Sequence, residues 1–117
     1  MTILKEYGIG NDKKFRYNLM KGTGESLSNM IGQRIKGIVA YLIFEQEDPK
    51  TGELQKILKL MVKNEDGSTA ILGTSSKSFV EGLLDYLVCM ESDELTELEV
   101  GSKRSLRNDM PYIVFIV

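Results

Sequence analysis

The chain lacks histidine and tryptophan and contains a single cysteine, Cys89. Without histidine, it has no imidazole to act as a general base or a metal ligand near neutral pH. One cysteine cannot close an internal disulfide, and it leaves no ligand set for a structural zinc site. We therefore expect a protein that is not an enzyme and holds no cofactor. The unpaired cysteine predicts a reducing, cytoplasmic location.

Long apolar runs and prolines are also scarce. No run reaches the roughly 18 apolar residues of a membrane helix, so no membrane partner is expected. The N-terminus lacks the apolar core of a signal peptide. The chain of 117 residues has two prolines, 42% hydrophobic residues and 27% charged residues. This composition predicts one ordered, soluble domain.

Three strand-like segments come first among the regular elements. Residues 34–47 are rich in Ile, Val, Tyr and Phe, and both alternating sets of positions are apolar. Such a strand is buried on both faces or shared between two sheets, and Gly37 marks a place for the bend that sharing requires. Residues 54–63 and 68–73 form the next two strands, each preceded by a turn that contains glycine.

One helix and two further strands complete the pattern. Phe79, Leu83 and Tyr86 recur at helical spacing, which predicts a helix over residues 76–90 with Cys89 as a small buried residue. Strands are expected over residues 95–103 and 110–117. The predicted order is three strands, a helix and two strands. The OB-fold, a small five-stranded barrel that binds oligonucleotides or oligosaccharides, has the same order.

The predicted fold class is therefore mainly β. Residues 25–117 are expected to form a five-stranded OB-fold-like barrel with one helix between strands 3 and 4. Residues 1–24 are expected to form an N-terminal arm or an extra strand.

Acidic residues gather in one segment of the chain. Residues 81–99 contain seven carboxylates and no Lys or Arg. Removing these seven from the 17 acidic residues leaves 10 against 15 basic residues, so the rest of the chain carries a charge of +5. Either the charges are scattered over a solvated surface, or the acidic side leaves a basic groove elsewhere that suits nucleic acid.

Three short stretches carry a likeness to a known family. They are Gln33-Arg34-Ile35-Lys36-Gly37-Ile38-Val39, the hairpin at Asp66-Gly67, and Thr74-Ser75-Ser76-Lys77-Ser78-Phe79. In these stretches, and in spacing over residues 25–117, the chain resembles the small single-stranded DNA-binding proteins of Gram-positive phages and mobile elements. The resemblance implies a protein that coats transient single strands during replication or transfer of such an element. It also implies the cytoplasm of a bacterial host, and replication proteins as further partners.

Single-strand binding needs rings on which bases stack and cations along the phosphates. Phe15 and Tyr17 alternate with basic residues, as in a nucleic-acid-binding arm, although a strand packed on the barrel would explain them too. Tyr41 and Phe44 lie on opposite faces of one strand, so at most one is expected to face a ligand. The loop between the last two strands carries three cations and is the favoured site. The predicted nucleic-acid-binding residues are Phe15, Arg16, Tyr17, Lys36, Tyr41, Phe44, Lys59, Lys63, Lys103, Arg104, Arg107 and Tyr112.

Two other functions compete with DNA binding. A protein-interaction module, such as a phage adaptor or a host-factor inhibitor, would use the acidic 81–99 segment and the apolar last strand as its contact surface. An enzyme would need a carboxylate pair, and no spacing singles one out. The apolar stretch 111–117 needs protection from aggregation, which either barrel closure or a homodimer would supply.

Overall fold

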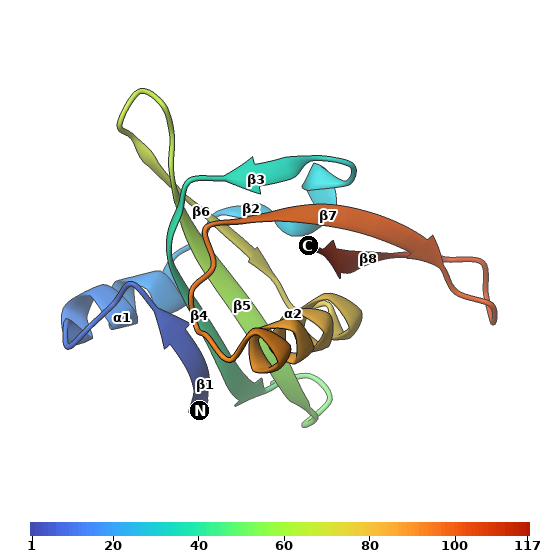
Figure 1. The fold of residues 1–117 in the computed structure, drawn as a ribbon. Helices are drawn as coiled ribbons and strands as arrows, with labels where there is room; N and C mark the ends of the chain where they lie inside the picture. Colours follow the sequence, from blue (N-terminus) through green and yellow to red (C-terminus); the bar gives the residue numbers. More distant parts are fainter.

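The computed structural model describes residues 1–117 as eight strands in two sheets, two α-helices and one turn of 3-10 helix (Figure 1). The larger sheet has the order β1 (Thr2–Tyr7), β4 (Ile38–Glu47), β5 (Leu54–Lys63), β6 (Thr69–Thr74) and β2 (Glu25–Ser26). The smaller sheet has the order β3 (Arg34–Lys36), β7 (Glu97–Arg104) and β8 (Pro111–Ile116). The helices are α1 (Lys13–Lys21), α2 (Lys77–Met90) and the 3-10 turn η1 (Leu27–Met30).

A kink at Gly37 divides the long strand that the sequence predicts over residues 34–47. Before the kink, β3 pairs with β7, and after it β4 pairs with β5, so one stretch of chain contributes to both sheets. Gly37 has a φ of +76°, and a Cβ there would lie 2.6 Å from the carbonyl oxygen of Lys63. The predicted bend and the sharing of this strand between two sheets are therefore confirmed.

The two sheets do not close into the expected five-stranded barrel. A closed OB-type barrel needs its last strand beside the third, but β8 does not pair with β6. The free edge of β6 instead pairs in parallel with β2, at Leu72 and Gly73. The turn η1 contacts both β6 and β8 and fills the space between them. The chain before residue 34 thus occupies the place where the barrel would close.

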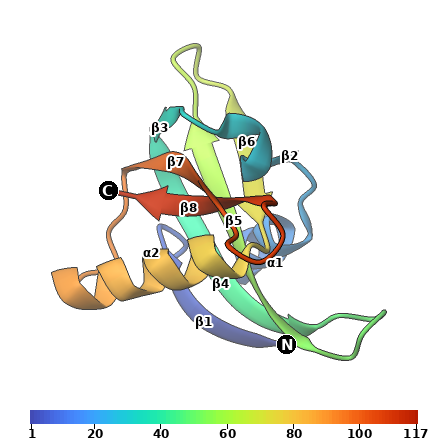
Figure 2. The same cartoon turned by 90° about the vertical axis from the view of Figure 1, so that its right-hand side faces the viewer.

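The main core lies between the sheets and is covered by α2, which Figure 2 shows running along β8. Phe79, Leu83 and Leu87 of α2 are fully buried, as their spacing predicts. The ring of Phe115 packs edge-on against Phe79, with centroids 6.0 Å apart. The expectation of a buried Cys89 is wrong, because Cys89 lies on the solvent side of the helix and is exposed. Neither helix is long and apolar enough to cross a membrane.

The first 24 residues form a strand and a helix. β1 extends the larger sheet by pairing with β4. Residues 13–17, expected in an arm or a strand, lie instead in α1. Asp12 caps this helix by accepting a hydrogen bond from the Phe15 N–H at 3.0 Å. Phe15 and Leu19, one helical turn apart, pack on the outer face of the larger sheet and form a second core.

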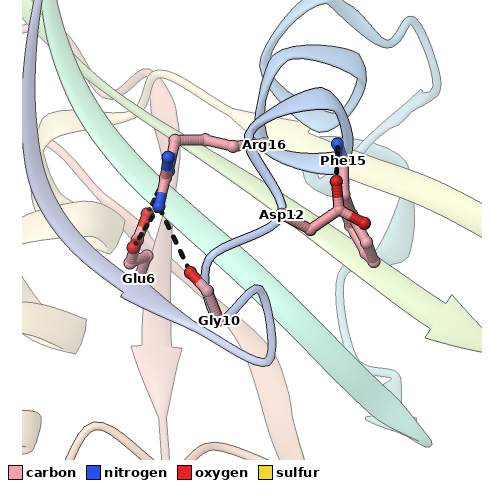
Figure 3. Close-up of polar contacts among 5 residues, drawn as sticks. All are labelled: Glu6, Gly10, Asp12, Phe15 and Arg16. Atoms are coloured by element: carbon pink, nitrogen blue, oxygen red, sulfur yellow. Dashed lines mark hydrogen bonds and ion pairs between the residues drawn. The ribbon is translucent and has the colours of Figure 1, made fainter.

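An ion pair fastens α1 to β1 (Figure 3). Arg16 donates from Nε to one Glu6 carboxylate oxygen at 2.7 Å and from Nη2 to the other at 2.8 Å. The same Nη2 lies 3.4 Å from the carbonyl oxygen of Gly10. The hydrogen bonds from Arg16 hold the pKa of the Glu6 carboxyl below its ordinary value of 4.5.

Replacing Glu6 by Gln tests this fastening. Because the pair with Arg16 lowers the pKa of Glu6, it stabilises the fold above pH 4.5. This stabilisation is lost as the pH falls through the pKa that Glu6 has in the folded protein. We expect wild type to exceed Glu6→Gln in stability by about 1 kcal/mol at pH 7, the upper end for a pair near the surface. The difference should be smaller at about pH 3, because protonation of Glu6 removes the ionic contact with Arg16. Urea unfolding at both pH values measures it, with the exposed and unpaired Glu65→Gln as control; a difference that does not change with pH would contradict the assignment.

Candidate nucleic-acid interface

Two of the predicted stacking residues belong to the core. Tyr41 is fully buried between the sheets and Phe44 is almost fully buried beneath α1, so neither ring faces a ligand. The Tyr41 hydroxyl donates to the carbonyl oxygen of Asp93 at 2.6 Å. Burial, with a smaller effect of the Asp93 charge, raises the pKa of this hydroxyl. At most one of these predicted binding residues was expected to face a ligand, and in the structure neither does, because α1 covers the face on which Phe44 lies.

Four predicted residues meet on the β7–β8 hairpin. Lys103 stands directly opposite Tyr112 across the two strands, so both side chains lie on the same face. Arg104 ends β7 and Arg107 lies in the loop that follows, and both are exposed. Figure 1 shows this end of the hairpin projecting from the body of the molecule. Tyr112 keeps 36% of its surface exposed, whereas Phe115 turns inward against α2.

The hairpin cations are only weakly neutralised. Arg104 Nη1 lies 3.6 Å from an Asp109 carboxylate oxygen, but the two side chains are 68% and 83% exposed. Exposed pairs of this kind contribute little and exchange readily for other anions. Lys103 and Arg107 form no ion pair. The hairpin end therefore presents three cations and one exposed aromatic ring to solvent.

A second group of predicted residues lies around α1, on the opposite side of the molecule from the hairpin end (Figures 1 and 2). Arg16 is committed to Glu6, and the Lys59 ammonium donates to the carbonyl oxygen of Gly22 at 2.7 Å. Both residues thus hold the N-terminal segment in place. Phe15 is partly buried beneath the helix, whereas Tyr17 is 58% exposed on its outer side. Of this group, only Tyr17 remains fully available.

Lys36 and Lys63 come together although they lie on different strands. Both line a hollow of about 700 Å³ beside the kink at Gly37, with Glu65 and Glu97 on its rim. Neither lysine forms an ion pair of its own. The hollow is therefore of mixed charge, and its cations remain available to phosphates.

Most of the acidic segment is neutralised by cations elsewhere in the chain. Asp93 pairs with Lys5 at 2.9 Å and Glu81 with Lys56 at 3.4 Å. Arg34 pairs with both Glu97 and Glu99, at 2.8 and 3.9 Å. These contacts use cations that lie away from the hairpin end and from the outer side of α1. Five of the ten cations that form no ion pair lie on those two surfaces.

The list of predicted binding residues leaves out three lysines of α1, although two of them, Lys13 and Lys14, are among the basic residues noted around Phe15 and Tyr17. Lys13, Lys14 and Lys21 are exposed and form no ion pair. Lys13, Tyr17 and Lys21 follow one another at four-residue intervals, so they share one stripe of the helix. This spacing was the available signal, but it indicates a shared face only if the segment is helical.

Comparison of the chain with models of known families, with curated proteins and with solved structures gives no significant match.

Proposed function

We propose that this protein binds single-stranded DNA with little sequence preference. The observation that carries the proposal is the β7–β8 hairpin, where Lys103 and Tyr112 share a face below an end that carries Arg104 and Arg107. Phosphates would replace the weak partner of Arg104 and pair with the other two cations. Tyr112 would offer a stacking surface, worth about 1–3 kcal/mol for each base.

The arrangement of the fold supports this proposal. Two features of residues 34–117 are typical of OB-type domains. One strand, bent at Gly37 into β3 and β4, is shared by two sheets, and α2 lies between the third and fourth strands when that bent strand is counted as the first. In such domains the loop between the last two strands flanks the ligand, and here that loop is the cationic end of the hairpin. We infer an OB-related module, opened between its third and last strands, that acts in the replication or transfer of a phage or mobile element.

A salt titration tests the proposed function directly. Binding of wild type to a labelled oligo-dT of about 16 nucleotides should be tight at low salt and weaken as salt rises, because counterions compete for the phosphate-binding cations. Fluorescence anisotropy gives the affinity at each salt concentration, and a duplex of equal length is the control. We expect the single strand to bind more tightly. No binding at low salt, or a preference for the duplex, would overturn the proposal.

One observation favours a different function. A groove of about 400 Å³ between α2 and β8 has apolar walls that include Tyr86 and Phe115, with Glu94 and the ion pair of Arg34 and Glu97 on its rim. It combines the acidic segment with the last strand, as a docking site for a basic peptide of a partner protein would. If oligo-dT does not bind at low salt, this protein-interaction module becomes the leading candidate.

A further inference from the structure

A second groove lies between α1 and the sheet beneath it. The helix rests on the outer face of β4, β5 and β6 through Phe15, Leu19 and Met20. It is held at its start by the Asp12 cap and the pair between Arg16 and Glu6. At its other end, Lys59 binds the carbonyl oxygen of Gly22, in the residue that follows the helix. The position of α1 on the sheet is therefore fixed by polar contacts at both ends.

The helix does not cover the whole sheet face. Along one side it leaves a groove of about 390 Å³ with an apolar floor, within the range of small-molecule sites. The floor consists of Phe15, Leu19, Met61 and Ile71. A partly exposed phenyl ring beside a thioether is a surface on which a flat, polarisable ring packs well.

The rim of the groove is polar and carries one cation, one carboxylate and one amide. Lys14, Asn18 and Asp12 stand along its helical side. One Asp12 oxygen is engaged in the helix cap, whereas Lys14 has no ion-pair partner. The exposed stripe of Lys13, Tyr17 and Lys21 continues outward from this rim. An apolar floor with one lysine and an amide above it suits a group that is flat on one side and anionic on the other.

The basic character continues along β5. Lys63 follows two residues after Met61, so both side chains lie on the same face of the strand. Lys63 also lines the hollow that contains Lys36. Cations thus lead from the groove to the kink at Gly37, as the phosphates of a bound strand require.

We propose that the groove beside α1 is a second DNA subsite, in which one unpaired base packs on Phe15 and Met61 while Lys14 holds a neighbouring phosphate. This inference rests on the proposed function and adds a contact on the side of the molecule opposite the hairpin. An unpaired base is the required ligand because duplex DNA keeps its base faces stacked and presents none to a groove. Asn18 would meet the polar edge of the base.

Changing Lys14 tests the subsite. Lys14→Gln should weaken binding of a 16-nucleotide oligo-dT about fivefold at ~0.1 M salt and lower the salt slope by about 1. Lys14→Glu should weaken it about tenfold or more. An acidic residue in the first turn of a helix favours folding, so the loss would not arise from unfolding of α1. Lys50→Glu, with the same charge change at an exposed turn away from both surfaces, is the matched control.

A second measurement reports on the groove itself. In a methyl NMR titration of wild type with oligo-dT, the signals of Met61 and Ile71 should shift, whereas that of Val88, exposed on α2, should not. If oligo-dT binds, but Lys14→Glu behaves as Lys50→Glu does and both groove methyl signals stay fixed, the subsite is overturned while the proposed function stands. If wild type does not bind oligo-dT at all, the proposed function fails, and the subsite fails with it.

Discussion

Replacing Arg104 and Arg107 together by Glu is expected to weaken binding to oligo-dT about 100-fold at ~0.1 M salt. The double variant removes two phosphate contacts and sets two negative charges against the strand. Both side chains are exposed, and the only side-chain polar contacts of Arg104 are with Asp109 in the same loop, so the change should be confined to this loop. Fluorescence anisotropy measures the affinity, and thermal unfolding verifies that stability is retained.

The matched control for this variant is Lys50→Glu with Lys77→Glu. Both lysines are exposed, neither forms an ion pair, and neither lies on the hairpin or beside α1. The two double variants therefore have the same net charge and differ only in where it is placed. Equal losses of affinity in both would show that total charge, not the hairpin, governs binding, and would contradict the assignment of the interface.

The second large effect concerns stability. Gly37→Ala should lower the free energy of unfolding by about 3 kcal/mol or more, which combines the cost of a left-handed backbone with that of overpacking. The added Cβ would lie 2.6 Å from the Lys63 carbonyl oxygen, so β4 and β5 have to separate or the kink has to open. Either change disturbs the one strand that joins the two sheets. Urea unfolding followed by circular dichroism measures the loss.

Gly67→Ala separates the two causes. Gly67 has a φ of +87°, but a Cβ there meets nothing within 4 Å. Only the backbone cost of about 1–2 kcal/mol applies to it. If both variants lose the same amount, the contact with Lys63 is unimportant, and the kink does not depend on close approach of the strands.

The strands were predictable because they follow rules that operate over a few residues. Leu58, Leu60 and Val62 alternate with the outward residues of β5, and the structure buries all three between the sheets. The apolar residues on both faces of residues 34–47 predicted a strand that is buried on both faces or shared between two sheets, and the structure shows the sharing. The pattern did not show that an N-terminal helix covers the outer face of this strand.

What sequence reasoning missed depends on contacts between distant segments. α1 has only nine residues, too few for a stable isolated helix. It is stabilised by the ion pair of Arg16 with Glu6 and by the packing of Leu19 against the larger sheet. The free edge of β6 is likewise covered by a two-residue pairing with β2, which no local pattern indicates. The hairpin cations are neighbours in the sequence, so their grouping was predictable, whereas the shared face of the α1 lysines required knowledge of the helix.

The distribution of tyrosine gives the protein a built-in optical probe. With no tryptophan and five tyrosines in the chain, its near-ultraviolet emission arises from tyrosine alone. Tyr41 is fully buried, whereas Tyr17 and Tyr112 are the two most exposed and lie on the two proposed DNA surfaces. Stacking of a base on either ring would quench that ring's emission. In Tyr17→Phe the quenching on DNA binding would report on Tyr112, and in Tyr112→Phe it would report on Tyr17. Each side of the molecule could thus be followed separately without an attached dye.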